Sequence, residues 1–117
     1  MKEKRPCRRL TIELPAHYFL TENEKNGKSI TLVNVSSGGL CFISEIALDT
    51  RKHIYLKVPI ENKGFVILKT LVVWHRKHQE IPNHYLNGVK ILRQNSADAK
   101  NFIRFCEKKL LYPPDEY

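Results

Sequence analysis

The chain has 117 residues, of which 42% are hydrophobic and 27% charged, and its formal net charge is +8. This length and composition are typical of one folded domain with a modest core. The longest strongly apolar stretch, 65–74, is interrupted by Lys69 and Thr70 and is much shorter than the roughly 20 residues that span a bilayer. No apolar segment follows the basic N-terminus, so we expect no signal peptide, no membrane insertion and a cytoplasmic location.

The positive charge is concentrated at the N-terminus. Residues 1–9 contain five Lys or Arg and one Glu, a net charge of +4 and half of the total excess. This distribution predicts a flexible basic arm over 1–9 that favours anionic partners. Within the arm, Arg5 and Arg9 each carry a planar guanidinium, whose N–H donors suit phosphate groups and guanine edges.

From Leu10 onward the sequence predicts short strands separated by turns. Apolar and polar residues alternate over 10–14, which indicates a half-buried strand that 16–20 can continue beyond Pro15. The other predicted strands cover 29–35, 40–44, 54–60, 65–75 and 85–92, and 76–83 is predicted to be a charged loop. Strands at near-regular spacing with no helix between them indicate an antiparallel sandwich or small barrel.

The end of the sequence predicts one helix over about 96–111. Ser96 offers an N-cap, Asp98 suits the first turn, and Lys108 and Lys109 suit the last one. The predicted buried stripe consists of Phe102, Ile103, Cys106 and Leu110. We expect this stripe to pack on the barrel or to cover one of its openings.

No sequence pattern points to catalysis, to a metal or to a cofactor. The chain lacks a G-x-S-x-G elbow and a phosphate-binding Walker loop, and its carboxylates form no obvious acid–base pair, so we expect no enzyme activity. His75 and His78 lie three residues apart in a strand or loop and are expected to be surface or hydrogen-bonded side chains rather than ligands. The three cysteines, Cys7, Cys41 and Cys106, form no C-x-x-C pair, which argues against a disulfide framework or zinc site. Cys41 and Cys106 are expected in the core, as is Trp74.

A polar turn lies between the strands predicted over 29–35 and 40–44. Its residues Asn34, Ser36 and Gly39 follow the pattern N-x-S-x-x-G. Taken alone, this pattern is common in an ordinary hairpin turn. The same residues also provide hydrogen-bonding groups and an open backbone that a ligand could approach.

The order of the motifs resembles the PilZ domain family, which binds the bacterial second messenger cyclic di-GMP. Arg5 and Arg9 form R-x-x-x-R, and Asn34 of the second motif follows Arg9 by 25 residues. The resemblance covers about residues 4–111 and extends to the segments 72–74 and 88–90. It implies a mainly β fold: a six-stranded antiparallel barrel with one C-terminal helix, forming a single domain over 10–112 after the arm.

The resemblance also implies a ligand site and a mode of action. The expected cyclic di-GMP-binding residues are Arg5, Arg9, Asn34, Ser36 and Gly39, with Arg8 and Gly38 as possible further contacts. The arginines would bind the phosphates and guanine edges, and the turn would bind guanine or phosphate. Ligand binding would order the arm, and a downstream protein partner would recognise the changed surface of this adaptor.

Two alternatives stay open at this point. Asn34 in place of the family's commoner Asp, and Pro6 inside R-x-x-x-R, allow a ligand-independent protein-interaction module with the same fold. The basic charge allows a small nucleic-acid-binding barrel. Nucleic acid is nevertheless not expected as a partner, because exposed aromatic residues are few and show no stacking pattern on adjacent strands.

Overall fold

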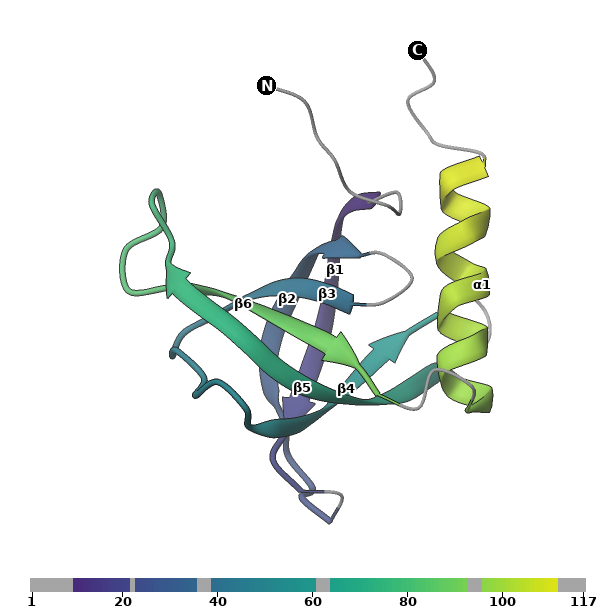
Figure 1. Cartoon of the computed structure of the whole chain (residues 1–117), viewed down its shortest axis with the longest axis horizontal. Coiled ribbons are helices and arrows are strands. Elements are labelled where there is room, and N and C mark those ends of the chain that lie inside the picture. Colours follow the sequence, from purple (N-terminus) through teal and green to yellow (C-terminus); the bar gives the residue numbers. More distant parts are fainter. Residues whose placement is uncertain (1–9, 22, 36–38, 61–63, 93–95, 112–117) are drawn as a thin grey trace.

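Six antiparallel strands close into a barrel, followed by one helix, in the computed structural model (Figure 1). The structure describes residues 10–21, 23–35, 39–60, 64–92 and 96–111. The elements are β1 (Leu10–Phe19), β2 (Lys28–Val35), β3 (Gly39–Ser44), β4 (His53–Pro59), β5 (Phe65–Lys77), β6 (Tyr85–Ile91) and α1 (Ala97–Leu111). Around the barrel the strands follow the order β1-β2-β3-β6-β5-β4, and β4 pairs again with β1. The predicted barrel with one C-terminal helix is confirmed.

Alternation of side chains builds the core of the barrel. In β4, Ile54, Leu56 and Val58 point inward and are fully buried, whereas Tyr55 and Lys57 lie between them on the outer face. Each of the other strands contributes in the same way. Their buried apolar residues are Ala16, Tyr18, Ile30, Leu32, Val35, Leu40, Phe42, Val66, Leu68, Val72, Val89 and Ile91. Closure leaves no free sheet edge around most of the barrel, and each strand needs only one apolar face.

Strand β5 extends further than the sequence predicts. Arg76 and Lys77 were expected in a charged loop, but both pair with β6, and Lys77 lies opposite Tyr85. The hairpin closes beyond them with a hydrogen bond of 2.9 Å from the His78 N–H to the His84 carbonyl. Both cationic side chains are exposed, so their charge does not oppose strand pairing. The expected boundary at residue 76 was therefore wrong by two residues.

Helix α1 begins where the sequence predicts. The Ser96 hydroxyl accepts a hydrogen bond of 3.2 Å from the Ala99 N–H, which makes Ser96 the N-cap. Ala99, Phe102 and Cys106 are buried in the same cluster as the barrel interior, and α1 contacts β5 and β1. The helix therefore completes the core of the barrel.

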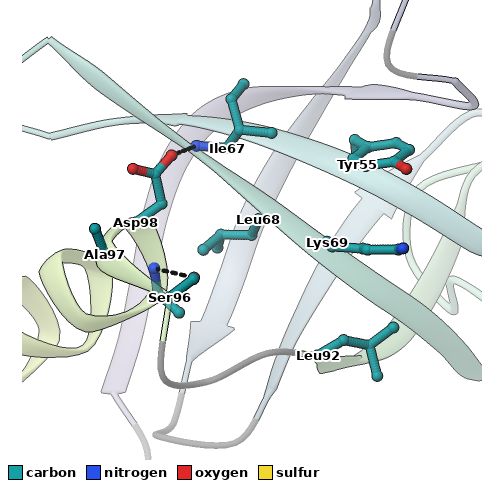
Figure 2. Close-up of a pocket in the computed structure, with 9 residues that line it drawn as sticks. Tyr55, Ile67, Leu68, Lys69, Leu92, Ser96, Ala97 and Asp98 are labelled. Atoms are coloured by element: carbon teal, nitrogen blue, oxygen red, sulfur yellow. Dashed lines mark hydrogen bonds between the residues drawn. The ribbon is translucent and has the colours of Figure 1, made fainter.

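A carboxylate joins the start of the helix to the sheet. Asp98 accepts a hydrogen bond of 2.8 Å from the backbone N–H of Ile67 (Figure 2). The pairing of β6 with β5 begins only at Ile91 and Thr70, so β6 does not run beside Ile67. Asp98 thus satisfies a backbone donor that the neighbouring strand leaves unpaired, and it fixes α1 against β5.

A buried amide holds the connection between β3 and β4. The Asn87 side chain is fully buried, accepts a hydrogen bond of 3.1 Å from the Leu48 N–H and donates one of 2.7 Å to the Ser44 hydroxyl. The Nδ1–H of His75 donates to the Leu48 carbonyl at 2.8 Å. These contacts fix Leu48 against β5 and β6, so His75 has a structural partner, as expected from the sequence.

Tyr18 gives the fold a dependence on alkaline pH. Its ring stacks on Phe42, with centroids 6.3 Å apart, and burial, followed by the nearby Glu24 carboxylate, raises the pKa of its hydroxyl. A raised pKa means that the folded protein favours the neutral phenol. The stability that neutral Tyr18 contributes is therefore complete below pH 10, the ordinary pKa of tyrosine, and is lost as pH rises through the pKa of the folded state. Urea titrations above pH 10 should show a steeper loss of stability in the parent than in Tyr18→Phe. Equal slopes in the two proteins would contradict this assignment.

Candidate functional site

The polar turn of the sequence motif joins β2 to β3. β2 ends at Val35 and β3 begins at Gly39. Asn34 is the last residue but one of β2, and its side chain is partly exposed. The structure therefore describes two of the predicted binding residues, Asn34 and Gly39. The other predicted binding residues lie outside the described residues: Arg5, Arg9 and Ser36, with the possible contacts Arg8 and Gly38.

A β-bulge places Asn34 on the outside of the barrel. Leu32 lies opposite Phe42 and Val35 lies opposite Leu40, and all four side chains are buried. Leu32 and Val35 are three residues apart, so without an extra residue they would point to opposite faces of the strand. The register shift between Leu32 and Asn34 supplies that residue. It leaves the side chain of Asn34 opposite position 41 of β3, on the outer side.

Gly39 allows β3 and β6 to approach closely. It pairs with Lys90, and a Cβ atom at this position would overlap the carbonyl oxygen of Val89. The overlap involves backbone, which cannot rotate away as a side chain could. The last glycine of the motif therefore has a structural role in the β3–β6 pairing.

Trp74 lies on the outer surface, which corrects the expectation that it is a core residue. Its side chain is 39% exposed and covers Gly88, where a Cβ atom would overlap the indole. The inward residue Val72 lies two positions earlier, and regular alternation would have sent Trp74 inward as well. The register shift between Val72 and Trp74 reverses the direction. The guanidinium carbon of Arg76 lies 5.5 Å from the centre of the Trp74 ring.

The two bulges turn both Trp74 and Asn34 to the outer surface of the barrel. Trp74 pairs with Gly88, Gly88 with Cys41, and Cys41 with Asn34, so these four positions form a row across β5, β6, β3 and β2. Three strand spacings of about 4.8 Å make the row roughly 14 Å long, measured along the curved wall of the barrel. We call this row the motif face. Its two central positions carry small side chains, and its ends present an indole and an amide.

Substituting Gly88 should displace the indole. Trp74 is the single tryptophan of the chain, so its fluorescence reports on this position alone. In Gly88→Ala the added methyl group should push the ring away from the sheet, giving a red-shifted emission that iodide quenches more strongly. Ile81→Ala, on the exposed part of the β5–β6 hairpin, is a control that should leave the emission unchanged. An unchanged spectrum in Gly88→Ala would contradict the packing of the ring on Gly88.

Two further histidines stabilise the turn of the β5–β6 hairpin. His78 Nδ1 accepts hydrogen bonds of 3.0 Å from the N–H groups of Glu80 and Ile81, and His84 Nδ1–H donates to the Pro82 carbonyl at 2.9 Å. Among the described residues, no group of three or more His, Cys, Asp or Glu side chains is arranged to hold a metal ion. No helix in the described ranges is long and apolar enough to cross a membrane. Cys41 and Cys106 are both buried, as predicted.

Comparison with solved structures supports the same fold. Inhibitor of motility (MotI/DgrA) from Bacillus subtilis matches with a TM-score of 0.74 and 12% identity, over 97% of this chain and 55% of that one. The PilZ domain of YcgR from Escherichia coli, solved with c-di-GMP, matches with a TM-score of 0.67 and 14% identity, over 97% of this chain and 100% of that one. The MrkH–c-di-GMP complex from K. pneumonia matches with a TM-score of 0.63 and 14% identity, over 94% of this chain and 51% of that one. The chain thus spans about half the length of MotI/DgrA and of MrkH.

A search of curated protein sequences found no match. The family model for the PilZ domain matches residues 2–108, which is nearly the whole chain. PilZ domains typically bind c-di-GMP and are generally non-catalytic receptors. The match covers both motifs as well as the six strands, and on this basis the chain belongs to the PilZ domain family.

Proposed function

We propose that this protein is a non-catalytic receptor for cyclic di-GMP, which it binds on the motif face. The observation that carries the proposal is the row formed by Trp74, Gly88, Cys41 and Asn34. The row links a flat aromatic ring at one end to a hydrogen-bonding amide at the other, and the amide lies beside the turn that completes N-x-S-x-x-G. The matched PilZ domain of YcgR was solved with c-di-GMP, which supports the choice of ligand.

Each group has a chemical task in this proposal. Cyclic di-GMP has two phosphate charges and two guanines, and Arg5 and Arg9 bind a phosphate and the O6/N7 edge of a guanine through paired N–H donors. Asn34 and Ser36 hydrogen-bond guanine or phosphate, and Arg8 and Gly38 add further contacts. The exposed ring of Trp74 offers a surface on which a base can stack.

The proposal also includes how the signal is passed on. Ligand binding orders the basic arm (1–9) against the barrel domain (10–112), in the cytoplasm, and a downstream protein partner recognises the changed surface. Ordering the arm costs roughly 1–2 kcal/mol of backbone entropy per residue. The charge-assisted contacts of the arginines must offset several such contributions, so the arm alone should not dock in the absence of ligand.

The decisive experiment is a titration of the full chain with cyclic di-GMP, followed by calorimetry and by the emission of Trp74. We expect saturable heat and a change in Trp74 emission that saturates at the same ligand concentration. GMP, which has one guanine and one phosphate, is the control and should bind far more weakly. Absence of heat and of any spectral change would refute the receptor and would favour a ligand-independent protein-interaction module.

A further inference from the structure

The outer side of β1, β4 and β5 carries a second surface with its own chemistry. Its residues alternate aromatic rings with cationic or titratable side chains, and we call it the aromatic–cationic face. It consists of His17, Phe19, Tyr55, Lys57, Phe65 and Lys69. Phe65 is 52% exposed, and the neighbouring Leu20 and Ile67 are 43% and 39% exposed. Large apolar groups that remain in solvent beside lysines mark a binding surface rather than core.

Strand register brings these residues together. Phe19 lies directly opposite Tyr55, and Tyr55 lies directly opposite Lys69 on the next strand. Tyr55 and Lys69 appear on neighbouring strands in Figure 2. The register places two partly exposed aromatic side chains opposite each other on adjacent strands. Phe19 and Tyr55 are 36 positions apart in the chain, so the pattern exists only in the closed barrel.

Two hollows lie on the face, and both are open to solvent. One has a volume of about 570 Å³ and the other about 430 Å³, and Phe19, Lys25, Lys57 and Phe65 line both of them. The ring of Phe19 packs against Gly27, where a Cβ atom would come within 2.7 Å of it. Because the Phe19 ring rests on the backbone of Gly27, it is held in place before a ligand binds, and this lowers the entropic cost of binding.

The charge of the face selects an anion. Lys57 and Lys69 belong to the face and Lys25 lines both of its hollows, and the Nζ of Lys57 lies 4.1 Å from the centre of the Phe65 ring. Two carboxylates border the face, and one oxygen of each accepts a backbone hydrogen bond. Glu24 accepts a hydrogen bond of 2.8 Å from the Leu20 N–H, and Asp98 accepts one from the Ile67 N–H. Each carboxylate thus has a backbone donor as a partner, and three lysines outnumber the two carboxylates.

The aromatic–cationic face is separate from the motif face. In the closed order of strands, β4 lies across the barrel from β3, on which the motif turn ends. The two faces share only β5, on which Trp74 pairs with β6 and lies beyond the segment Phe65–Leu71 that pairs with β4. A ligand on one face leaves the other face open.

We propose that the aromatic–cationic face binds single-stranded nucleic acid, with bases stacked on its rings and phosphates held by its lysines. Aromatic side chains on adjacent strands with interleaved cations are the arrangement that sequence-tolerant single-strand binding uses. A protein partner fits less well, because Lys57 lies at the centre of the face, and the centres of protein interfaces are depleted of lysine. The site needs flat, anionic, repeated units, which a nucleic-acid strand supplies.

The test is a fluorescence anisotropy titration of the full chain with a fluorescein-labelled oligothymidylate of about 12 nucleotides. The parent should bind it, with an affinity that falls steeply as salt rises. Phe65→Leu keeps an apolar side chain but removes the ring, and should weaken binding about tenfold. Lys57→Gln should weaken binding and reduce the slope of log affinity against log salt by about 0.7. The matched controls Ile81→Ala and Lys100→Gln alter exposed residues elsewhere and should bind like the parent.

Three outcomes would overturn the proposal: no binding by the parent, equal binding by Phe65→Leu, or equally tight binding of a duplex of the same length, which indicates charge alone. An acidic peptide of alternating Glu and Phe is a further probe, and Phe65-dependent binding of that peptide alone would assign the face to a protein. Saturating cyclic di-GMP should not displace the oligonucleotide. Phe65→Leu should bind cyclic di-GMP like the parent. The cyclic di-GMP titration and the oligonucleotide titration therefore test the two proposed sites independently.

Discussion

Arg5→Ala and Arg9→Ala are each expected to reduce the affinity for cyclic di-GMP by about a hundredfold or more. In the proposed complex each guanidinium makes paired, charge-assisted hydrogen bonds, and truncating one leaves a phosphate or guanine edge without its partner. Such a loss costs about 2–5 kcal/mol, and about 1.4 kcal/mol corresponds to a factor of ten. Calorimetric titration of the two variants beside the parent measures the effect directly.

Three further variants separate the effect of the guanidinium group from that of charge alone. Arg5→Lys and Arg9→Lys keep the charge but remove the planar fork, so they should recover only a small part of the lost affinity. Lys2→Ala removes one charge from the same arm and should change the affinity little. If both alanine variants bound like the parent, the arm would have no role in binding, although the motif face could still hold the ligand.

Phe102→Ala is expected to lower the free energy of unfolding by about 3–5 kcal/mol. Phe102 is fully buried and anchors α1 in the core that the barrel strands form. Removing its ring costs both the transfer free energy of the ring and the cavity left behind. Because domains of this kind are stable by only about 5–15 kcal/mol, the variant should unfold at a much lower urea concentration in far-UV circular dichroism.

An exposed neighbour on the same helix is the matched control. Asn101→Ala changes the adjacent position, which faces solvent, and should alter the stability by at most about 0.5 kcal/mol. A loss below about 1 kcal/mol in Phe102→Ala would mean that α1 contributes little to the cooperative unit. In that case the barrel would unfold independently of the helix.

Local patterns predicted most of the elements correctly. The alternation over 54–60 corresponds to β4, and Ser96 caps α1 as the sequence suggests. Both features depend on residues close together in the chain, where side-chain period and hydrogen-bond geometry are fixed by backbone dihedrals. The sequence predicts the end of β5 two residues too early because Arg76 and Lys77 are charged, although exposed strand positions accept charge.

Positions next to a bulge could not be assigned to a face from the sequence. Trp74 follows the inward Val72 by two residues, a spacing that predicts burial, yet it lies on the outside. Val33 and Asn34 present the same difficulty on β2. A bulge shifts the side-chain alternation by one, and its position depends on the partner strand, which local sequence does not contain.

The sequence by itself determined the strand and helix content, the basic arm, and the presence and order of the two motifs with Arg5, Arg9 and Asn34. These features follow from residue type and short-range spacing. Only the tertiary structure decided that Trp74 joins the motif face and that Phe19, Tyr55 and Phe65 gather on the opposite side of the barrel. Those assemblies depend on strand order, register and closure, because pairing between strands brings residues together whatever their distance along the chain.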